Sequence, residues 1–435
     1  MRSESVKGSA EACTSDVRDD PVCEFYTSNP YPPPIEDLDH ARDMYRDENV
    51  RRAEYHLMWP HKKYCEDLDV LVAGCGTWQS AKEAISHPGA RVVGIDVSPT
   101  SLEHTEKLKR KYDLTHLETR QLPVENIGEL DQSFDLIICT GVLHHLVDPD
   151  AGLRALRSVL KPEGAMFLMV YAPYGRAGVY MIREYCNRLG IGTSQQEIND
   201  LTSVLKEMPA HNLLLSTLRG SMDSLTADFL VDAVMNPRDK AYSVPQLFDF
   251  IERNDLKFDR WYWQAPYLPQ CGAIATTAHA DRLTRLPERE QYTLMELWRG
   301  LMTNHYVLVQ RDGGLEVRFD DERYFRYVPI RRSWTVVIGQ GLPDGVAAAL
   351  LNQTHPFEDL ILFIDAQEKR MFEAIDGRRS ISEIVDKVKE EGPSPLLKQR
   401  QAPRAYGRDV SLHAREFFEK LWLYDQVVFD TSKAQ

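Results

Sequence analysis

Short apolar runs alternate with longer amphipathic stretches between residues 68 and 171. Most of the runs are rich in Val, Ile, Leu or Phe, as strands buried on both faces are, and parallel strands need covering elements between them. The pattern therefore predicts a doubly wound α/β sheet with right-handed crossovers. We expect strands at 68–73, 91–96, 116–120, 134–140 and 165–171, and helices at 77–86, 98–112 and 149–161.

The pattern becomes helical and polar after this sheet, which predicts a helical insertion at about 176–240. An amphipathic helix at 244–256 follows, and β-like runs occupy 257–263 and 305–311. These three elements are expected to complete the sheet as its last helix and antiparallel pair. A short helix is also expected within 39–60, ended by a proline.

Both ends of the chain differ from this core. Residues 1–38 are polar and then proline-rich, which predicts an extended N-terminal arm. Residues 315–435 predict a smaller α+β module, helical or winged-helix-like, with strand-like pieces at 316–319 and 334–339 and helical pieces at 372–391 and 414–430. Its role is either recognition or packing on the catalytic core, for stability or for the formation of a homodimer. The expected domains are thus 1–38, 39–312 and 315–435.

Composition narrows the class of protein. The 435 residues are 43% apolar, and 66 acidic against 52 basic residues give a net charge of −14, which disfavours nucleic acid as a partner. The N-terminal 20 residues lack the apolar segment of a signal peptide, and no long apolar run predicts a membrane span. Seven scattered cysteines without a CxxC pair suggest neither a metal site nor disulfides. We expect a cytoplasmic protein that does not bind membranes.

A glycine-rich turn follows the first strand, in VLVAGCGTW at 70–78. Gly74 and Gly76 lack a Cβ where the chain enters a helix, so the backbone can approach a ligand closely. A tight turn without any ligand is the alternative interpretation. A dinucleotide-binding loop would carry a third glycine at position 79, where this chain has Gln79, and this argues against NAD.

Asp96 ends the second strand, about 20 residues beyond Gly76. A carboxylate at this position can accept hydrogen bonds from both ribose hydroxyls of a nucleoside-containing ligand. The alternative is that Asp96 caps the following helix, and the two roles are compatible.

These features combine with FDLIICTGVLHHLVDPDAGLRALRSVLKPEGAMFLMVYAP at 134–173. The succession of strand, HHL turn, helix, KPEG turn and strand resembles the class I S-adenosylmethionine-dependent methyltransferases. The resemblance covers about 66–174 strongly and 240–312 loosely. It implies a Rossmann-like core, an enzyme of class EC 2.1.1, and S-adenosylmethionine as the methyl donor.

The resemblance also implies roles for individual residues. The methionine moiety would contact Ala73, Gly74, Cys75 and Gly76; the ribose Asp96; the adenine Val97, Gln121 and Leu122; and the donor would be lined by Thr140, Gly141 and Val142. Two positions depart from the family: Val72 replaces a common acid, and Trp78 replaces a third glycine. A donor contact by an acid of the first strand is therefore in doubt.

Three residues are candidates for catalysis. The donor carries an activated methyl group, so the protein mainly aligns acceptor and donor, and a base is needed only when the acceptor must lose a proton. His144 or His145 is the candidate base, and Tyr171 would shape the acceptor site; packing is the alternative role for all three.

The acceptor is expected to be a small molecule or a peptide. AIDGRRSISEIVDKV at 374–388 is similar to peptide-recognition modules related to the PqqD family, and the whole arrangement resembles bacterial multidomain methyltransferases of undetermined substrate. Two other functions stay open: a catalytically inactive S-adenosylmethionine-binding scaffold or sensor, and a nucleic-acid (tRNA) methyltransferase.

Overall fold

The computed structural model describes residues 21–209, 211–218, 226–314, 316–354, 356–391 and 410–434. The chain divides into two compact units, each drawn from separate stretches of sequence. The first unit takes in Met1–Leu38, Leu68–Gly164 and Met169–Ala241, and the second Asp39–Asp67, Ala165–Leu168 and Tyr242–Gln435. The expected domain limits at residues 38 and 312 stay a prediction.

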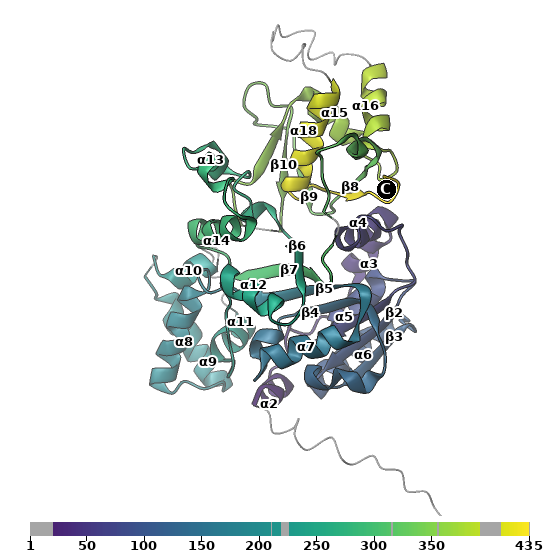
Figure 1. Cartoon of the computed structure of the whole chain (residues 1–435). Helices are drawn as coiled ribbons and strands as arrows, with labels where there is room; N and C mark the ends of the chain where they lie inside the picture. The colour runs from purple at the N-terminus through teal and green to yellow at the C-terminus, as the bar shows by residue number, and fades with distance from the viewer. Residues whose placement is uncertain are drawn as a thin grey trace, which may run out of the picture. The chain divides into compact units, whose positions relative to one another are not determined.

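Seven strands form one sheet in the order β3-β2-β1-β4-β5-β7-β6 (Figure 1). β1 pairs in parallel with β2 and β4, whereas β6 and β7 are antiparallel. This order confirms the predicted doubly wound, Rossmann-like α/β sheet. From β1 the chain adds β2 and β3 on one side of the sheet and β4 and β5 on the other side. Open α/β sheets usually bind ligands at the point where the order of the strands changes in this way. The strands are β1 Asp69–Ala73, β2 Arg91–Asp96, β3 Leu117–Gln121, β4 Phe134–Thr140, β5 Leu160–Tyr171, β6 Lys257–Trp261 and β7 Asn304–Gln310.

The helices between the parallel strands begin at clear sequence signals. Ser98 accepts a hydrogen bond from the N–H of Ser101 at 3.2 Å at the start of α6, and Asp148 accepts one from Ala151 at 3.0 Å at the start of α7. A proline follows each cap. Right-handed crossovers place α5 and α6 on one face of the sheet and α7 on the other. Their bounds are α5 Gln79–Ser86, α6 Pro99–Lys111 and α7 Pro149–Val159.

A helical insertion follows β5 in the first unit (Figure 1). It has its own core, which includes Val179, Leu201, Leu214 and Leu230. A capping box at Ser194 starts α9. The elements are α8 Ala177–Leu189, α9 Gln195–Lys206, α10 Leu213–Thr217, α11 Ala227–Phe229 and the π-helical turn η4 Leu230–Val234.

The N-terminal segment of the first unit is partly helical, which the sequence did not predict. Residues Pro21–Ser28 form helix α2, and Cys23 on one face of it is buried. The side chains of Thr27 and Asn29 bond to carbonyls four residues earlier and help to close this helix. The part of the predicted arm before residue 21 lies outside the described residues.

The second unit contains two small antiparallel sheets besides β6 and β7. One has the order β11-β10-β9 and the other pairs β12 with β8. One apolar core joins the strands β10, β11 and β12 to the last helices. The elements are α3 Asp39–Tyr45, α4 Glu48–Met58, α12 Val244–Glu252, α13 Ala280–Leu283, α14 Glu288–Arg299, β8 Val328–Arg331, β9 Thr335–Ile338, β10 Ala348–Asn352, β11 Ile361–Ile364, α15 Ala366–Glu373, α16 Ile381–Glu390, α18 Val410–Leu423 and β12 Val427–Asp430.

Two expectations for this part of the chain were wrong. Residues 316–319 form no strand, although Val317 and Phe319 are buried in the core. The predicted helix at 414–430 ends at Leu423, and strand β12 follows. Asp425 has a φ of +55°, which breaks the helix and lets the following β-branched residues pair with β8.

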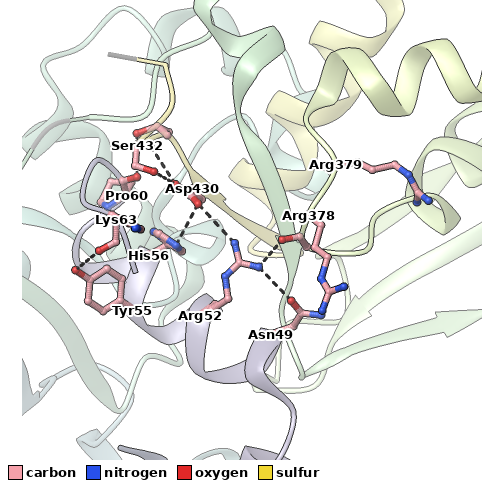
Figure 2. A network of polar contacts seen from close by, with 12 residues as sticks. Asn49, Arg52, Tyr55, His56, Pro60, Lys63, Arg378, Arg379, Asp430 and Ser432 are labelled. Carbon is pink, nitrogen blue, oxygen red and sulfur yellow. Dashed lines mark hydrogen bonds and ion pairs between the residues drawn. The ribbon is translucent and has the colours of Figure 1, made fainter. Parts of the chain in front are cut away.

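A network of polar contacts joins α4 to β12 within the second unit (Figure 2). Arg52 and His56 lie 3.5 and 3.6 Å from the carboxylate of Asp430. Arg52 also donates to the carbonyl of Gly377. A Cβ on Gly377 would come within 2.3 Å of Asn49, so glycine lets this turn lie close to α4. Burial lowers the pKa of His56 to about 4, so its ring is neutral at pH 7.

Within the described ranges, no helix has both the length and the apolar character needed to cross a membrane. None of the six cysteines in these ranges forms a disulfide. Burial raises the pKa of the Cys75 and Cys139 thiols, so both stay protonated and unreactive near neutral pH.

Candidate functional site

The chain turns sharply after β1 at two glycines. Gly74 and Gly76 have φ angles of +69° and +54°, in the left-handed region that favours glycine. The N–H groups of Gly74 and Cys75 both donate to the carbonyl of Ile95, at 2.8 and 2.9 Å. A Cβ on Gly74 would lie 2.2 Å from Val142. The loop is therefore fixed to the end of β2 and packs closely against the loop after β4.

Asp96 connects this turn to the start of α6. One carboxylate oxygen accepts from the N–H of Gly76 and the other from the N–H of Ser98, both at 2.8 Å. Burial raises the pKa of Asp96, and these two hydrogen bonds oppose the rise. Ser98, and not Asp96, caps α6. Each carboxylate oxygen retains acceptor capacity for a further donor.

The ends of β2 and β3 lie next to each other. Asp96 is in register with Gln121, and the N–H of Leu122 donates to the carbonyl of Asp96 at 3.0 Å. The exposed side chain of Gln121 donates to the carbonyl of Val97 at 3.0 Å. The three residues expected beside the adenine are thus neighbours of Asp96, the residue expected to bind the ribose.

The exit of β4 meets the glycine turn from the other side. Thr140 and Gln79 are hydrogen-bonded, with the hydroxyl 2.9 Å from the amide nitrogen. Gly141 has a φ of +77° and donates to the carbonyl of Met169 at 3.3 Å. Sequence reasoning missed this role of Gln79, although its departure from the dinucleotide pattern marked the position.

The two histidines after β4 have different surroundings. His145 donates through Nδ1 to the carbonyl of Arg238, which fixes its tautomer. His144 is buried, and neither of its ring nitrogens has a hydrogen-bond partner among the described residues. Its ring centroid lies 3.8 Å from that of Tyr171. Burial lowers the pKa of His144 well below its usual value and that of His145 to about 4, so both are neutral at pH 7.

Sequence reasoning missed a buried carboxylate beside these residues. Asp232 of η4 accepts from the hydroxyl of Tyr26 at 2.9 Å and from that of Tyr171 at 3.3 Å. The guanidinium of Arg176 lies 3.5 Å from the centroid of the Tyr171 ring and pairs with Asp239 at 3.1 Å. Asp232 lies in a helical segment without a recognisable motif, so no local pattern marked it.

These residues are compatible with an adenosyl sulfonium ligand in most respects. Gly74 keeps part of the turn exposed, although Gly76 is buried, and Asp96 offers acceptor oxygens for hydroxyl groups. The side chains of Ala73 and Cys75 are fully buried, so only their backbone is suited to face a ligand. Val72 is buried between Gly94 and Ile138, which explains why β1 offers no acid here.

Fold and site together define the class. A sheet in the order 3-2-1-4-5-7-6, with a glycine turn after β1 and an acid ending β2, is the Rossmann-like core of class I methyltransferases. Residues 71–166 match the family described as "Methyltransferase domain". Residues 71–166 therefore form a methyltransferase domain, and the sheet has the predicted Rossmann-like methyltransferase core.

Curated relatives share only part of their length with this chain. It is 32% identical over 241 residues to an uncharacterised protein of Synechococcus, a match that covers 52% of this chain and 56% of that protein. It is 31% identical over 99 residues to a ubiquinone biosynthesis O-methyltransferase of Acinetobacter baylyi, covering 22% and 41%. The chain thus spans about half the length of the curated relatives it matches.

Solved structures extend the similarity of fold. PKMT2 from Rickettsia typhi superposes with a TM-score of 0.63 at 14% identity, covering 89% of this chain and 76% of that protein. A second structure of PKMT2, in complex with AdoHcy, gives a TM-score of 0.56 at 16% identity, covering 86% and 75%. At these identities the likeness shows the fold alone.

Proposed function

We propose that the protein transfers a methyl group from S-adenosylmethionine to a small-molecule or peptide acceptor. The observation that carries this proposal is the left-handed turn at Gly74 and Gly76, joined to the Asp96 carboxylate, within the matched residues 71–166. The names of the relatives support it, since one acts as an O-methyltransferase and PKMT2 binds AdoHcy.

Each group at the carboxyl edge of the sheet has a role in this proposal. The donor supplies a methyl group already activated by its sulfonium. The backbone of Ala73, Gly74, Cys75 and Gly76 contacts the methionine moiety, Asp96 holds the ribose, Val97, Gln121 and Leu122 contact the adenine, and Thr140, Gly141 and Val142 line the donor. Gln79 holds the hydroxyl of Thr140 in place.

His144, His145 and Tyr171 face the acceptor in this proposal. His144 is neutral and its two ring nitrogens have no partner among the described residues, so its unprotonated nitrogen can accept a hydrogen bond from the acceptor. His145 is held by Arg238 and positions its neighbour. The Tyr171 ring packs between His144 and Arg176 and forms one wall of the acceptor site.

Ligand-dependent stability tests the donor assignment. S-adenosylmethionine and S-adenosylhomocysteine should each raise the unfolding temperature of the full chain, and NAD should leave it unchanged, because only a ligand of the folded state stabilises it. An effect of NAD without an effect of the other two would refute the assignment.

Methyl transfer from labelled donor to a cell extract tests the acceptor. We expect incorporation that survives nuclease treatment, and protease treatment then separates a peptide from a metabolite. Loss of the label after nuclease would favour a nucleic-acid methyltransferase. Donor binding without any transfer would favour an inactive scaffold or sensor. A protease-sensitive product would also support the peptide-recognition role proposed for residues 374–388.

A further inference from the structure

Residues 21–34, which we call the strap, lie across the glycine turn after β1. A Cβ added to Gly76 would lie 2.7 Å from Cδ of Pro32 and 2.8 Å from the carbonyl oxygen of Tyr31. The hydroxyl of Thr77 donates to the carbonyl of Pro32 at 2.7 Å. The strap therefore contacts the same turn that the proposed function gives to the methionine moiety.

The strap also contacts the loop after β2. Sγ of Cys23 lies 3.5 Å from the carbonyl oxygen of Val97, and the hydroxyl of Ser98 donates to the carbonyl of Tyr26 at 3.1 Å. Cys23 is buried by this packing. Two of the loops assigned to the donor thus share one covering segment.

A buried polar contact holds the strap on its other side. The hydroxyl of Tyr26 donates to Asp232 at 2.9 Å and accepts from the side-chain amide of Asn236 at 2.8 Å. Asp232 and Asn236 are only 4% and 1% exposed. Because buried polar groups lose much free energy when a partner is removed, these two bonds favour the closed position of the strap.

We propose that the strap is the outer wall of the donor site and that Tyr26 is the positioning residue that holds it closed. This inference rests on the proposed function, because the covered loops are the ones assigned to S-adenosylmethionine. Donor and product leave only when the strap lifts from Gly76 and Val97. The bonds of Tyr26 to Asp232 and Asn236 therefore slow ligand release and help to exclude water from the reacting groups.

Dissociation of S-adenosylhomocysteine from the full chain, measured by surface plasmon resonance, tests this wall. Tyr26→Phe removes only the hydroxyl and should speed release by roughly tenfold, the effect expected from losing about one net hydrogen bond. Tyr185→Phe, which alters an exposed tyrosine of α8, is the matched control and should release at the wild-type rate. Hydrogen exchange should also show slower exchange of the amides of 21–28 when the ligand binds.

A second pair of variants guards against misfolding of Tyr26→Phe. Thr77→Val removes the hydroxyl that holds Pro32 and should speed release, whereas Thr77→Ser keeps it and should restore the wild-type rate. If both Tyr26→Phe and Thr77→Val release the ligand at the wild-type rate, the proposal that the strap closes the donor site is wrong, and the proposed function is unaffected. A wild-type chain that fails to bind S-adenosylhomocysteine would overturn the proposed function, and the strap with it.

Discussion

The backbone N–H of Gly76 donates to the carboxylate of Asp96 at 2.8 Å, which fastens the turn after β1 to the end of β2. The carboxylate therefore links the turn after β1 directly to the end of β2. The second carboxylate oxygen accepts from Ser98 and extends this link to the start of α6.

Replacing this carboxylate should weaken donor binding. Asp96→Ala removes the acceptor for the ribose hydroxyls, and hydrogen bonds to charged groups contribute about 1.5–3 kcal/mol, so affinity for S-adenosylhomocysteine should fall roughly 10- to 100-fold. Isothermal calorimetry measures the change. Asp131→Asn, at an exposed aspartate elsewhere in the first compact unit, is the control and should bind S-adenosylhomocysteine with wild-type affinity. Unchanged affinity in Asp96→Ala would contradict the assigned site.

A methyl group at Gly74 should destabilise the fold more than one at Gly190. Both glycines have a left-handed φ, +69° and +66°. A Cβ at Gly190 meets no atom within 4 Å, whereas one at Gly74 would lie 2.2 Å from Val142. Gly190→Ala should therefore cost only the conformational term of about 1–2 kcal/mol, and Gly74→Ala roughly 1–3 kcal/mol more through the clash.

Urea unfolding of the two variants measures this difference. The double variant Gly74→Ala with Val142→Ala should recover part of the loss, because it removes the clashing methyl groups. Equal losses at Gly74 and Gly190 would show that the close approach to Val142 is not rigid.

The two adjacent histidines should respond in opposite ways to substitution by phenylalanine. His144→Phe removes two buried nitrogens that lack partners in the described residues, so the unfolding free energy should stay level or rise by about 1 kcal/mol while turnover falls. His145→Phe breaks the bond to Arg238 and should lower stability. Thermal unfolding and turnover at saturating donor test both variants. Unaltered turnover in His144→Phe would assign this residue to packing.

The buried carboxylate of Asp232 should make stability depend on pH. Burial raises its pKa from 3.8 to about 6, against the opposing effects of Tyr26, Arg176 and Tyr171, with Asp239 adding to the rise. A raised folded-state pKa means that this contribution is complete below about pH 4 and is lost as pH rises through about 6. The loss by pH 7 is roughly 2–3 kcal/mol.

Asp232→Asn should abolish that part of the pH dependence. The variant should gain stability relative to the wild type between pH 4 and 7, because the amide never ionises. Urea unfolding of both proteins across this range measures the gain. A constant difference would mean that Asp232 titrates normally.

Arg52 should matter more than Arg46, an exposed arginine in the turn between α3 and α4. Arg52→Met leaves the carboxylate of Asp430, whose side chain is only 9% exposed, without its cationic partner and should cost about 2–4 kcal/mol. Arg46→Met breaks an ion pair with Asp43 whose side chains are 67% and 61% exposed, and it should change stability by less than about 0.5 kcal/mol. Thermal unfolding compares the two variants, and equal effects would contradict the role of the Asp430 network.

The sequence was sufficient for the parallel part of the sheet and for the residues at its carboxyl edge. The runs at 91–96 and 134–140 are apolar, short and bounded by polar residues, and β2 and β4 occupy these ranges. Gly74 and Gly76 could be identified because a left-handed turn strongly favours glycine. Asp96 could be identified because it is an acid placed at the end of an apolar strand. Their roles toward a ligand stay predictions.

Tertiary contacts decided what the sequence left open. Helix α2 was expected as extended chain, since its eight residues hold few helix signals and depend on the burial of Cys23. Strand β12 was expected as helix, because the apolar residues after Leu421 continue a helical pattern and only the backbone of Asp425 breaks it. Tyr26 and Asp232 are 206 positions apart, beyond the reach of any local pattern.

The pairing of β12 with β8 limits how far the chain can be shortened from its C-terminal end. A protein cut before Val427 would leave β8 with an open edge and deprive Arg52 and His56 of Asp430. Affinity tags and deletions are therefore better tolerated away from the last strand, and C-terminal trimming by proteases should yield a protein that aggregates.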